Sequence, residues 1–358
     1  MKLFTVGPVE MSPATRAIGS MAIPYFRTPQ FSQRMQQIEA DILGAVKAPA
    51  GARSVLLTAS GSGAMEAAVV GVFRRDEPLL VINGGTFGQR FAEICERHEM
   101  NYTVLDLPFE EDLTAAHLAP YRGKGYKGLL IQGHETSIGK RLDLKMVGAW
   151  CKEQGCLMVA DCVSSFLVDP VDMADMNMDV FLTASQKSLA LPPGLTIVVC
   201  TREVIENRIM QQTGLSYYLD LKAAYRNAER GQTPYTPALS IVFQLEDRLQ
   251  QIEAAGGVEA CIQTSANLAG YFREQVLQRT PFRMPPYSLS NGLTPLLTGT
   301  LDAYQMFLDL MNNKGQVLTP CGGDRAKTMV RVGHMGYLHK EDYDVLLDCL
   351  EEYGRNGR

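Results

Sequence analysis

The feature that most constrains the fold is an alternation, over residues 53–201, of short apolar runs with segments of helical periodicity. Near-continuous apolar strands separated by helices predict a mostly parallel sheet covered on both faces, which is a doubly wound α/β domain. The apolar runs are SVLLT (54–58), PLLVIN (78–83), YTVLDL (102–107), GLLIQG (128–133), LMVAD (157–161), DVFLTA (179–184) and LTIVVC (195–200).

After residue 240 the pattern changes to long amphipathic helices, predicted over about 240–279. Short strands then alternate with helices, and a last helix is predicted around 340–353. We expect an N-terminal segment (1–14), a large α/β domain (15–240) and a small C-terminal α+β domain (241–358).

Composition narrows the class of function. The chain has 358 residues, a net charge of −5 and scattered basic residues, so no footprint for nucleic acid or an anionic membrane is present and small-molecule partners are expected. Its eight cysteines lie mostly inside apolar runs and none is paired with histidine at zinc spacing, which predicts a reducing cytoplasm and no metal site. The apolar start of MKLFTVGPVE is too short for a signal or a membrane span.

Loops at the carboxyl ends of the predicted strands carry unusual residues, and such loops form the binding crevice of doubly wound sheets. Ser60, Gly61 and Ser62 stand between a strand and a helix, where free N–H groups make a phosphate cradle or the hydroxyls simply cap the helix. Phe87 precedes the inward face of the next helix and has a ring suited to stacking on an aromatic ligand.

Three further positions carry polar chemistry. The segment QGHETSIG (132–139) offers Thr136 or His134 as a ligand contact. Asp161 ends a buried strand, where a carboxylate requires a cation or a strong donor. Lys187 follows another strand in ASQKSLALPPG. A phosphate cradle, a flat ring, a buried carboxylate and a loop lysine together match the needs of pyridoxal 5'-phosphate.

At these residues the chain resembles the class V aminotransferases of the fold-type I pyridoxal phosphate enzymes, especially the alanine–glyoxylate/serine–pyruvate aminotransferase branch. The resemblance runs from VGPVEMSP (6–13) to MVRVGHMG (329–336). It implies that Lys187 is the Schiff-base lysine and that Asp161 meets the pyridine nitrogen. The other residues that it assigns to the cofactor are Ser60, Gly61, Ser62 and Gln186 for the phosphate, Phe87 and Val163 for the ring faces, and Thr136 for the 3' oxygen.

The resemblance also implies a homodimer, because Thr236 matches a residue that reaches the phosphate of the neighbouring subunit. Arg331 matches the arginine that binds the substrate carboxylate. The expected reaction is ping-pong transamination between an alanine- or serine-type amino acid and pyruvate or glyoxylate.

Alternatives remain open from the residues themselves. Arg27 is a second cation that fits a distal anion, as in 2-aminoethylphosphonate or aspartate, or else it forms an ordinary surface ion pair. A cysteine desulfurase or lyase needs an exposed reactive thiol, for which Cys321 is the candidate. A sugar aminotransferase and a non-catalytic binding protein on the same fold are the remaining alternatives.

Overall fold

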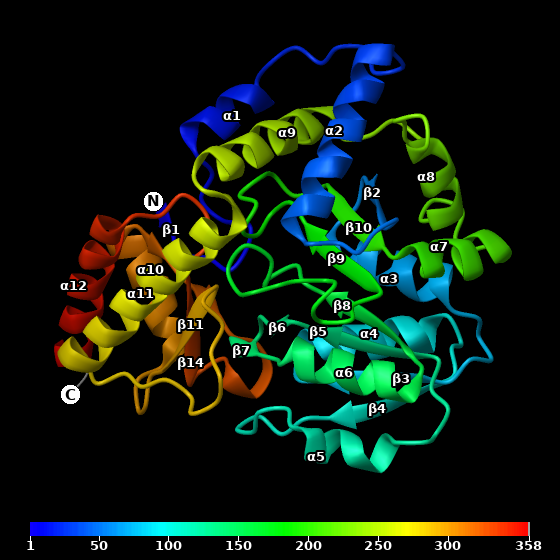
Figure 1. Ribbon diagram of the computed structural model, residues 1–358. Helices are drawn as coiled ribbons and strands as arrows, with labels where there is room; N and C mark the ends of the chain where they lie inside the picture. Colours follow the sequence, from blue (N-terminus) through cyan, green and yellow to red (C-terminus); the bar gives the residue numbers. More distant parts are fainter. Residues whose placement is uncertain (357–358) are drawn as a thin grey trace.

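A seven-stranded sheet forms the centre of the larger part of the computed structural model, which describes residues 1–356 (Figure 1). The strands lie in the order β2-β10-β9-β8-β5-β3-β4. Because only β10 is antiparallel to its neighbours, the predicted mostly parallel sheet is confirmed. The strands are β2 (Arg53–Leu57), β3 (Leu79–Asn83), β4 (Tyr102–Asp106), β5 (Gly128–Gln132), β8 (Leu157–Asp161), β9 (Val180–Ala184) and β10 (Thr196–Cys200).

Helices cover both faces of the sheet, because side chains alternate between the faces along every strand. In β2, for example, Leu56 belongs to one apolar core and Val55 to the other. The first core is closed by α2 (Pro29–Ala45), α6 (Leu144–Gln154) and α9 (Leu239–Ala254). The second is closed by α3 (Gly61–Val72), α4 (Thr86–Arg97), α7 (Arg202–Asn207) and α8 (Leu221–Ala228).

The smaller part, yellow to red in Figure 1, has its own core around an antiparallel sheet ordered β11-β14-β13. Its elements are α10 (Gly257–Arg279), β11 (Leu293–Leu297), α11 (Ala303–Lys314), β12 (Gln316–Val317), β13 (Thr319–Pro320), β14 (Met329–Gly333) and α12 (Lys340–Asn356). The N-terminal strand β1 (Lys2–Leu3) pairs with β12, and Phe4 lies in this same core. The start of the chain is therefore anchored to its C-terminal part. The remaining short elements are α1 (Pro13–Gly19), α5 (Ala115–Leu118), β6 (His134–Glu135) and β7 (Lys140–Arg141).

The sheet register determines where polar residues meet. Asp161 at the end of β8 pairs with Gln132 of β5 on one side and with Leu182 of β9 on the other. The parallel strands β3, β5, β8 and β9 therefore end at the same edge, as the crevice rule for doubly wound sheets requires. Among the described residues, no helix is both long and apolar enough to cross a bilayer.

Candidate active site

Lys187 lies just beyond β9, and its side chain is only 7% exposed. Its Nζ donates a hydrogen bond to the carbonyl of Val6, from the N-terminal segment. Burial lowers the pKa of Lys187 to about 8, the Arg331 guanidinium acts in the same direction, and Asp161 opposes both. The lysine is therefore an amine with an unusually large neutral fraction near physiological pH.

Gly7 permits this approach of the N-terminal segment. A Cβ at Gly7 would lie 2.6 Å from Cδ of Lys187, and the φ of +123° at Gly7 is rare for residues with side chains. Any larger residue here would displace the lysine. This close contact explains why the second residue of the motif VGPVEMSP is a glycine.

Asp161 is buried at the carboxyl end of β8. Its Oδ1 accepts the backbone N–H of Val163 at 2.8 Å. Burial raises the pKa of Asp161 to about 6, while that hydrogen bond and Lys187 pull it down. Asp161 and Lys187 each favour the charged form of the other, so the structure brings together the two residues assigned to catalysis.

The N-terminus of α3 lies at the same edge of the sheet. Its N-cap residue, Ser60, makes no capping hydrogen bond, so its hydroxyl is not used by its own helix. A Cβ on Gly61 would lie 3.1 Å from Cγ2 of Val163, which shows how closely these segments approach. The Ser62 hydroxyl accepts a 3.0 Å hydrogen bond from Arg90. Within the described chain, Oε1 of Gln186 is buried without a partner, so a donor is missing there.

Phe87 lies in the first turn of α4, with its ring centroid 5.8 Å from Nζ of Lys187. The N-cap of α4, Gly85, has no side chain to bond the first N–H groups. The fully buried carboxylate of Glu135 replaces it, because its Oε2 accepts from the N–H groups of Phe87 and Gly88, each at 3.1 Å. Glu135 therefore holds the aromatic ring in place.

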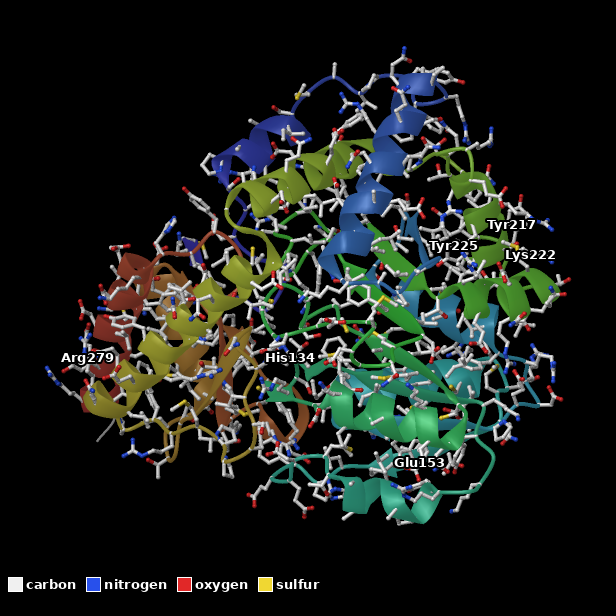
Figure 2. All side chains as sticks on the ribbon, in the orientation of Figure 1. His134, Glu153, Tyr217, Lys222, Tyr225 and Arg279 are labelled. Carbon is white, nitrogen blue, oxygen red and sulfur yellow. The ribbon has the colours of Figure 1, made fainter. Side chains whose placement is uncertain are left out.

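Thr136 is buried beside Glu135, and its hydroxyl donates to Oγ of Ser164 at 2.6 Å. His134, which Figure 2 places between the large sheet and the smaller part, donates from Nδ1 to the carbonyl of Ser164 at 2.8 Å. Burial lowers the pKa of His134 to about 3, so the ring is neutral. These bonds fasten the β6 strand to the loop after β8.

Arg331 reaches this region from β14 in the smaller part. Its Nη1 and Nη2 donate to the carbonyls of Thr136 (2.9 Å) and Pro320 (2.7 Å). The guanidinium lines an open cavity of about 670 Å³, which Phe87 also lines. Arg331 thus presents a cation in front of the ring and near the lysine.

Cys321 corrects the expectation of an exposed thiol. It is buried, its Sγ lies 3.7 Å from the carbonyl of Ser137, and burial raises its pKa. A buried thiol with a raised pKa is a poor nucleophile. The desulfurase alternative therefore loses its reactive cysteine.

Thr236 and Arg27 lie in a separate region. Thr236 is exposed in the loop between α8 and α9, beside Tyr218 and Tyr235. Arg27 donates from Nη1 to the carbonyl of Thr233 at 2.8 Å and to Oε1 of Gln232 at 3.1 Å. Arg27 therefore holds the segment that carries Thr236.

Sequence reasoning did not identify Glu135, Arg90 or Gly7. A signal for Glu135 lay in the expected helix start at Phe87, where glycines stand in place of a Ser, Asp or Asn cap and an acceptor is needed from elsewhere. Arg90 lies with its Cζ 4.7 Å from the Phe87 ring centroid, and its position on α4 gave no such signal. No group of three or more potential metal ligands occurs within residues 1–356.

Comparisons with known proteins agree with this geometry. The family described as aminotransferase class-V matches residues 25–314 of the chain. An uncharacterized aminotransferase of Helicobacter pylori strain J99 is 27% identical over 361 residues, which cover 98% of this chain and 93% of that protein.

Two solved structures are similar over nearly the whole length. An aspartate aminotransferase of subgroup IV from Thermus thermophilus has a TM-score of 0.91 and 25% identity, with 99% of both chains covered. An alanine–glyoxylate aminotransferase from Nostoc sp. has a TM-score of 0.90 and 23% identity, with 98% of this chain and 95% of that chain covered. The predicted fold class is thereby confirmed.

Proposed function

The chain belongs to the class V aminotransferase family and is a pyridoxal phosphate-dependent aminotransferase, and on that premise we propose its substrates and the roles of its residues. It moves the amino group of a small amino acid, of the alanine or serine type, to a 2-oxo acid such as pyruvate or glyoxylate. The observation that carries the proposal is the mutual effect of Lys187 and Asp161, two buried groups of opposite charge, beside the uncapped N-terminus of α3.

The residues present fit the cofactor. The Ser60 hydroxyl makes no capping hydrogen bond at a helix N-terminus, where anions bind well. When bound, pyridoxal phosphate supplies an aldehyde that links covalently to amines and a ring that withdraws electrons from the bound substrate. Its phosphate would be held by Ser60, Gly61, Ser62, Gln186 and the partner subunit's Thr236, its ring by Phe87 and Val163, its 3' oxygen by Thr136 and its ring nitrogen by Asp161.

Lys187 is assigned two tasks, to attach the cofactor and to move the proton. Its low pKa keeps much of the amine neutral. A neutral amine would accept the proton from the substrate Cα and return it to the cofactor carbon that carries the aldehyde. Asp161, ionised beside Lys187, would stabilise a proton on the ring nitrogen of the cofactor. Lys187 is thus assigned to proton transfer and Asp161 to the charge state of the ring.

Arg331 binds the substrate carboxylate. Its guanidinium is held by two carbonyls at the cavity wall, so the cation is in place before the substrate arrives. A planar fork of this kind suits a bidentate carboxylate. The arginine is thereby assigned to orientation, whereas Lys187 carries out the proton transfer.

The proposed enzyme is a homodimer whose active sites lie at the interface. Tyr217 is 84% exposed, and Tyr218 stacks on Tyr235 with 5.3 Å between ring centroids, next to the exposed Thr236. Solvent-facing aromatics of this kind are enriched at protein interfaces. Because Arg27 holds the Thr236 segment, it would enter the partner's site region together with it. The free cysteines, most of them buried, support a cytoplasmic location.

Cofactor attachment and turnover test the proposal. The purified protein with pyridoxal phosphate is expected to absorb beyond the range of aromatic side chains and to convert alanine and glyoxylate. Borohydride reduction followed by peptide mapping should label the Lys187 peptide. Lys140 is the internal control, because burial lowers its pKa to about 8 as well while its Nζ binds the carbonyls of Pro108 and Glu111. Label on Lys140 alone, or a colourless protein, would contradict the assignment.

A further inference from the structure

The cavity in front of Phe87 contains a second arginine. Arg325 ends the short 3-10 turn Gly323–Arg325, six residues before Arg331, and both arginines line the same space of about 670 Å³. The cavity is also lined by Phe87 and by Phe109. A small amino acid such as alanine, with one carboxylate, needs only one of these two cations.

Arg325 is not used by the protein itself. Within residues 1–356 its guanidinium makes no ion pair and donates no hydrogen bond; its Cζ lies over the ring of Phe109, 3.7 Å from the ring centroid. Stacking occupies only the face of a guanidinium and leaves its N–H groups in the plane free to bind an oxyanion. Phe109 therefore orients an unpaired cation beside the substrate cavity.

The acidic residues of the cavity do not neutralise Arg325. Asp106 accepts a 2.7 Å hydrogen bond from the side chain of Asn83. Asp324 precedes Arg325 on the same turn, yet the two side chains form no ion pair in the described structure. The nearby Lys140 is a further cation whose Nζ is already bound to backbone carbonyls. The two acidic residues that line the cavity therefore leave the Arg325 guanidinium without an ion pair in the described chain.

We infer that Arg325 binds the distal carboxylate of a dicarboxylic substrate whose other carboxylate is held by Arg331. The substrate class is a four- or five-carbon dicarboxylic amino acid or 2-oxo acid on one side of the reaction, and the small amino acid or 2-oxo acid of the proposed function is on the other side. This inference rests on the proposed function, because it concerns the same aminotransferase site. Arg27 is the candidate that the sequence offers for binding a distal anion, but Arg27 donates to backbone carbonyls of its own chain. We assign this role to Arg325 instead, because Arg325 lines the cavity.

Matched substrate pairs test the inference. Aspartate is alanine with one added carboxylate, and oxaloacetate is pyruvate with one added carboxylate. The holoenzyme should use the dicarboxylic member of at least one pair with the higher kcat/KM. Arg325→Gln should lower that value by roughly ten- to a hundredfold and change the alanine or pyruvate value by less than about twofold. Arg325→Lys, which keeps the charge but not the fork, should fall between.

A binding measurement separates this inference from the proposed function. Calorimetry of the holoenzyme with succinate and propionate, which also differ by one carboxylate, should show tighter binding of succinate, lost in Arg325→Gln. The exposed Arg122, paired with Glu153, provides the control Arg122→Gln, with the same change of net charge. No transamination of any pair defeats the proposed function, whereas active enzyme without a dicarboxylate preference defeats only the inference. An equal loss for all substrates in both Arg325 variants also overturns it.

Discussion

The carboxylate of Glu135 accepts the backbone N–H of Phe87 at 3.1 Å, across 48 residues of sequence. The same carboxylate takes the N–H of Gly88 and the Nε2 of Gln132, so it joins the start of α4 to the end of β5. The ring that faces Lys187 is thus positioned by a residue that touches neither the lysine nor the cavity. Glu135 acts on the site through the helix start and through its charge, which favours a higher pKa for both Lys187 and Asp161.

Glu135→Gln should weaken cofactor binding because the helix start loses a charged acceptor for its N–H groups. We expect at least a several-fold rise in the Kd for pyridoxal phosphate and a loss of about 1–3 kcal/mol in the free energy of unfolding. Absorbance titration and urea unfolding measure the two effects. Glu93→Gln, on the exposed side of the same helix, is the control. Unchanged affinity in Glu135→Gln would show that the ring does not depend on this bond.

Asp161→Asn should stabilise the cofactor-free protein at neutral pH while it slows catalysis. Burial raises the pKa of Asp161 to about 6, so the folded state binds the proton more tightly than the unfolded state. Its contribution to stability therefore falls as pH rises from about 4 to 6 and stays low above. The amide removes that cost and keeps an acceptor for Val163, so up to about 3 kcal/mol is gained at pH 7 and none at pH 4.

Urea unfolding of the cofactor-free protein at both pH values checks this prediction, with the exposed Asp76→Asn as control. Turnover of the holoenzyme should fall by orders of magnitude, because the ring nitrogen then lacks its anionic partner. Equal stability of Asp161→Asn and the parent at pH 7 would mean that burial of the Asp161 charge does not destabilise the fold. Turnover within a few-fold of the parent would mean that the carboxylate has no catalytic role.

Much of the arrangement of the candidate site was predictable from the sequence, because it depends on short segments of neighbouring residues. The apolar run at 179–184 became β9 (Val180–Ala184), and Lys187 follows it at the sheet edge because strand ends place their next residues there. Ser60 and Gly61 were found in the same way, as a turn before an apolar helix. These features depend on a few neighbouring residues.

What the sequence did not reveal depends on contacts between distant segments. The Glu135 bond, the stacking of Arg325 on Phe109 and the attachment of Arg27 to the Thr233 carbonyl each join elements that pack only in the folded chain. The expectation of an exposed Cys321 failed for the same reason, since the glycines after it suggested a free turn while Ser137 and Arg331 cover it. Local composition carries no information on such coverage.

The pKa of Lys187 should rise when Arg331 is replaced by a neutral residue. Burial is the main cause of the lowered pKa of Lys187, and the Arg331 guanidinium is the next. The rate at which the cofactor-free protein reacts with pyridoxal phosphate should rise with pH through about 8, since only the neutral amine attacks. Arg331→Gln should move this midpoint upward by roughly one pH unit. Stopped-flow absorbance measures it, with Arg122→Gln as control. A midpoint near that of free lysine in the parent would contradict the burial of Lys187.

Variants of Thr236 and Lys187 test whether each active site contains residues from both subunits. Thr236→Glu places a negative charge where the partner subunit's phosphate site is proposed to lie, and it should strongly reduce activity in the homodimer. Lys187→Ala should abolish activity in its own homodimer, because no other amine replaces Lys187. When the two variants are co-expressed, a mixed dimer has one site with an intact Lys187 and an intact Thr236 from the other subunit.

Co-expression should therefore restore activity to roughly a quarter of the parent value, since half of randomly formed dimers are mixed and each has one working site. If Thr236 serves its own chain instead, the site with Lys187 also carries the glutamate and nothing is restored. Purification through two different affinity tags, one on each variant, establishes that mixed dimers form. Thr264→Glu, at an exposed position of α10, is the control for the added charge. Its homodimer should be active without co-expression of a second variant. Recovery in the mixed dimer would locate each active site across two chains, with Lys187 from one and Thr236 from the other.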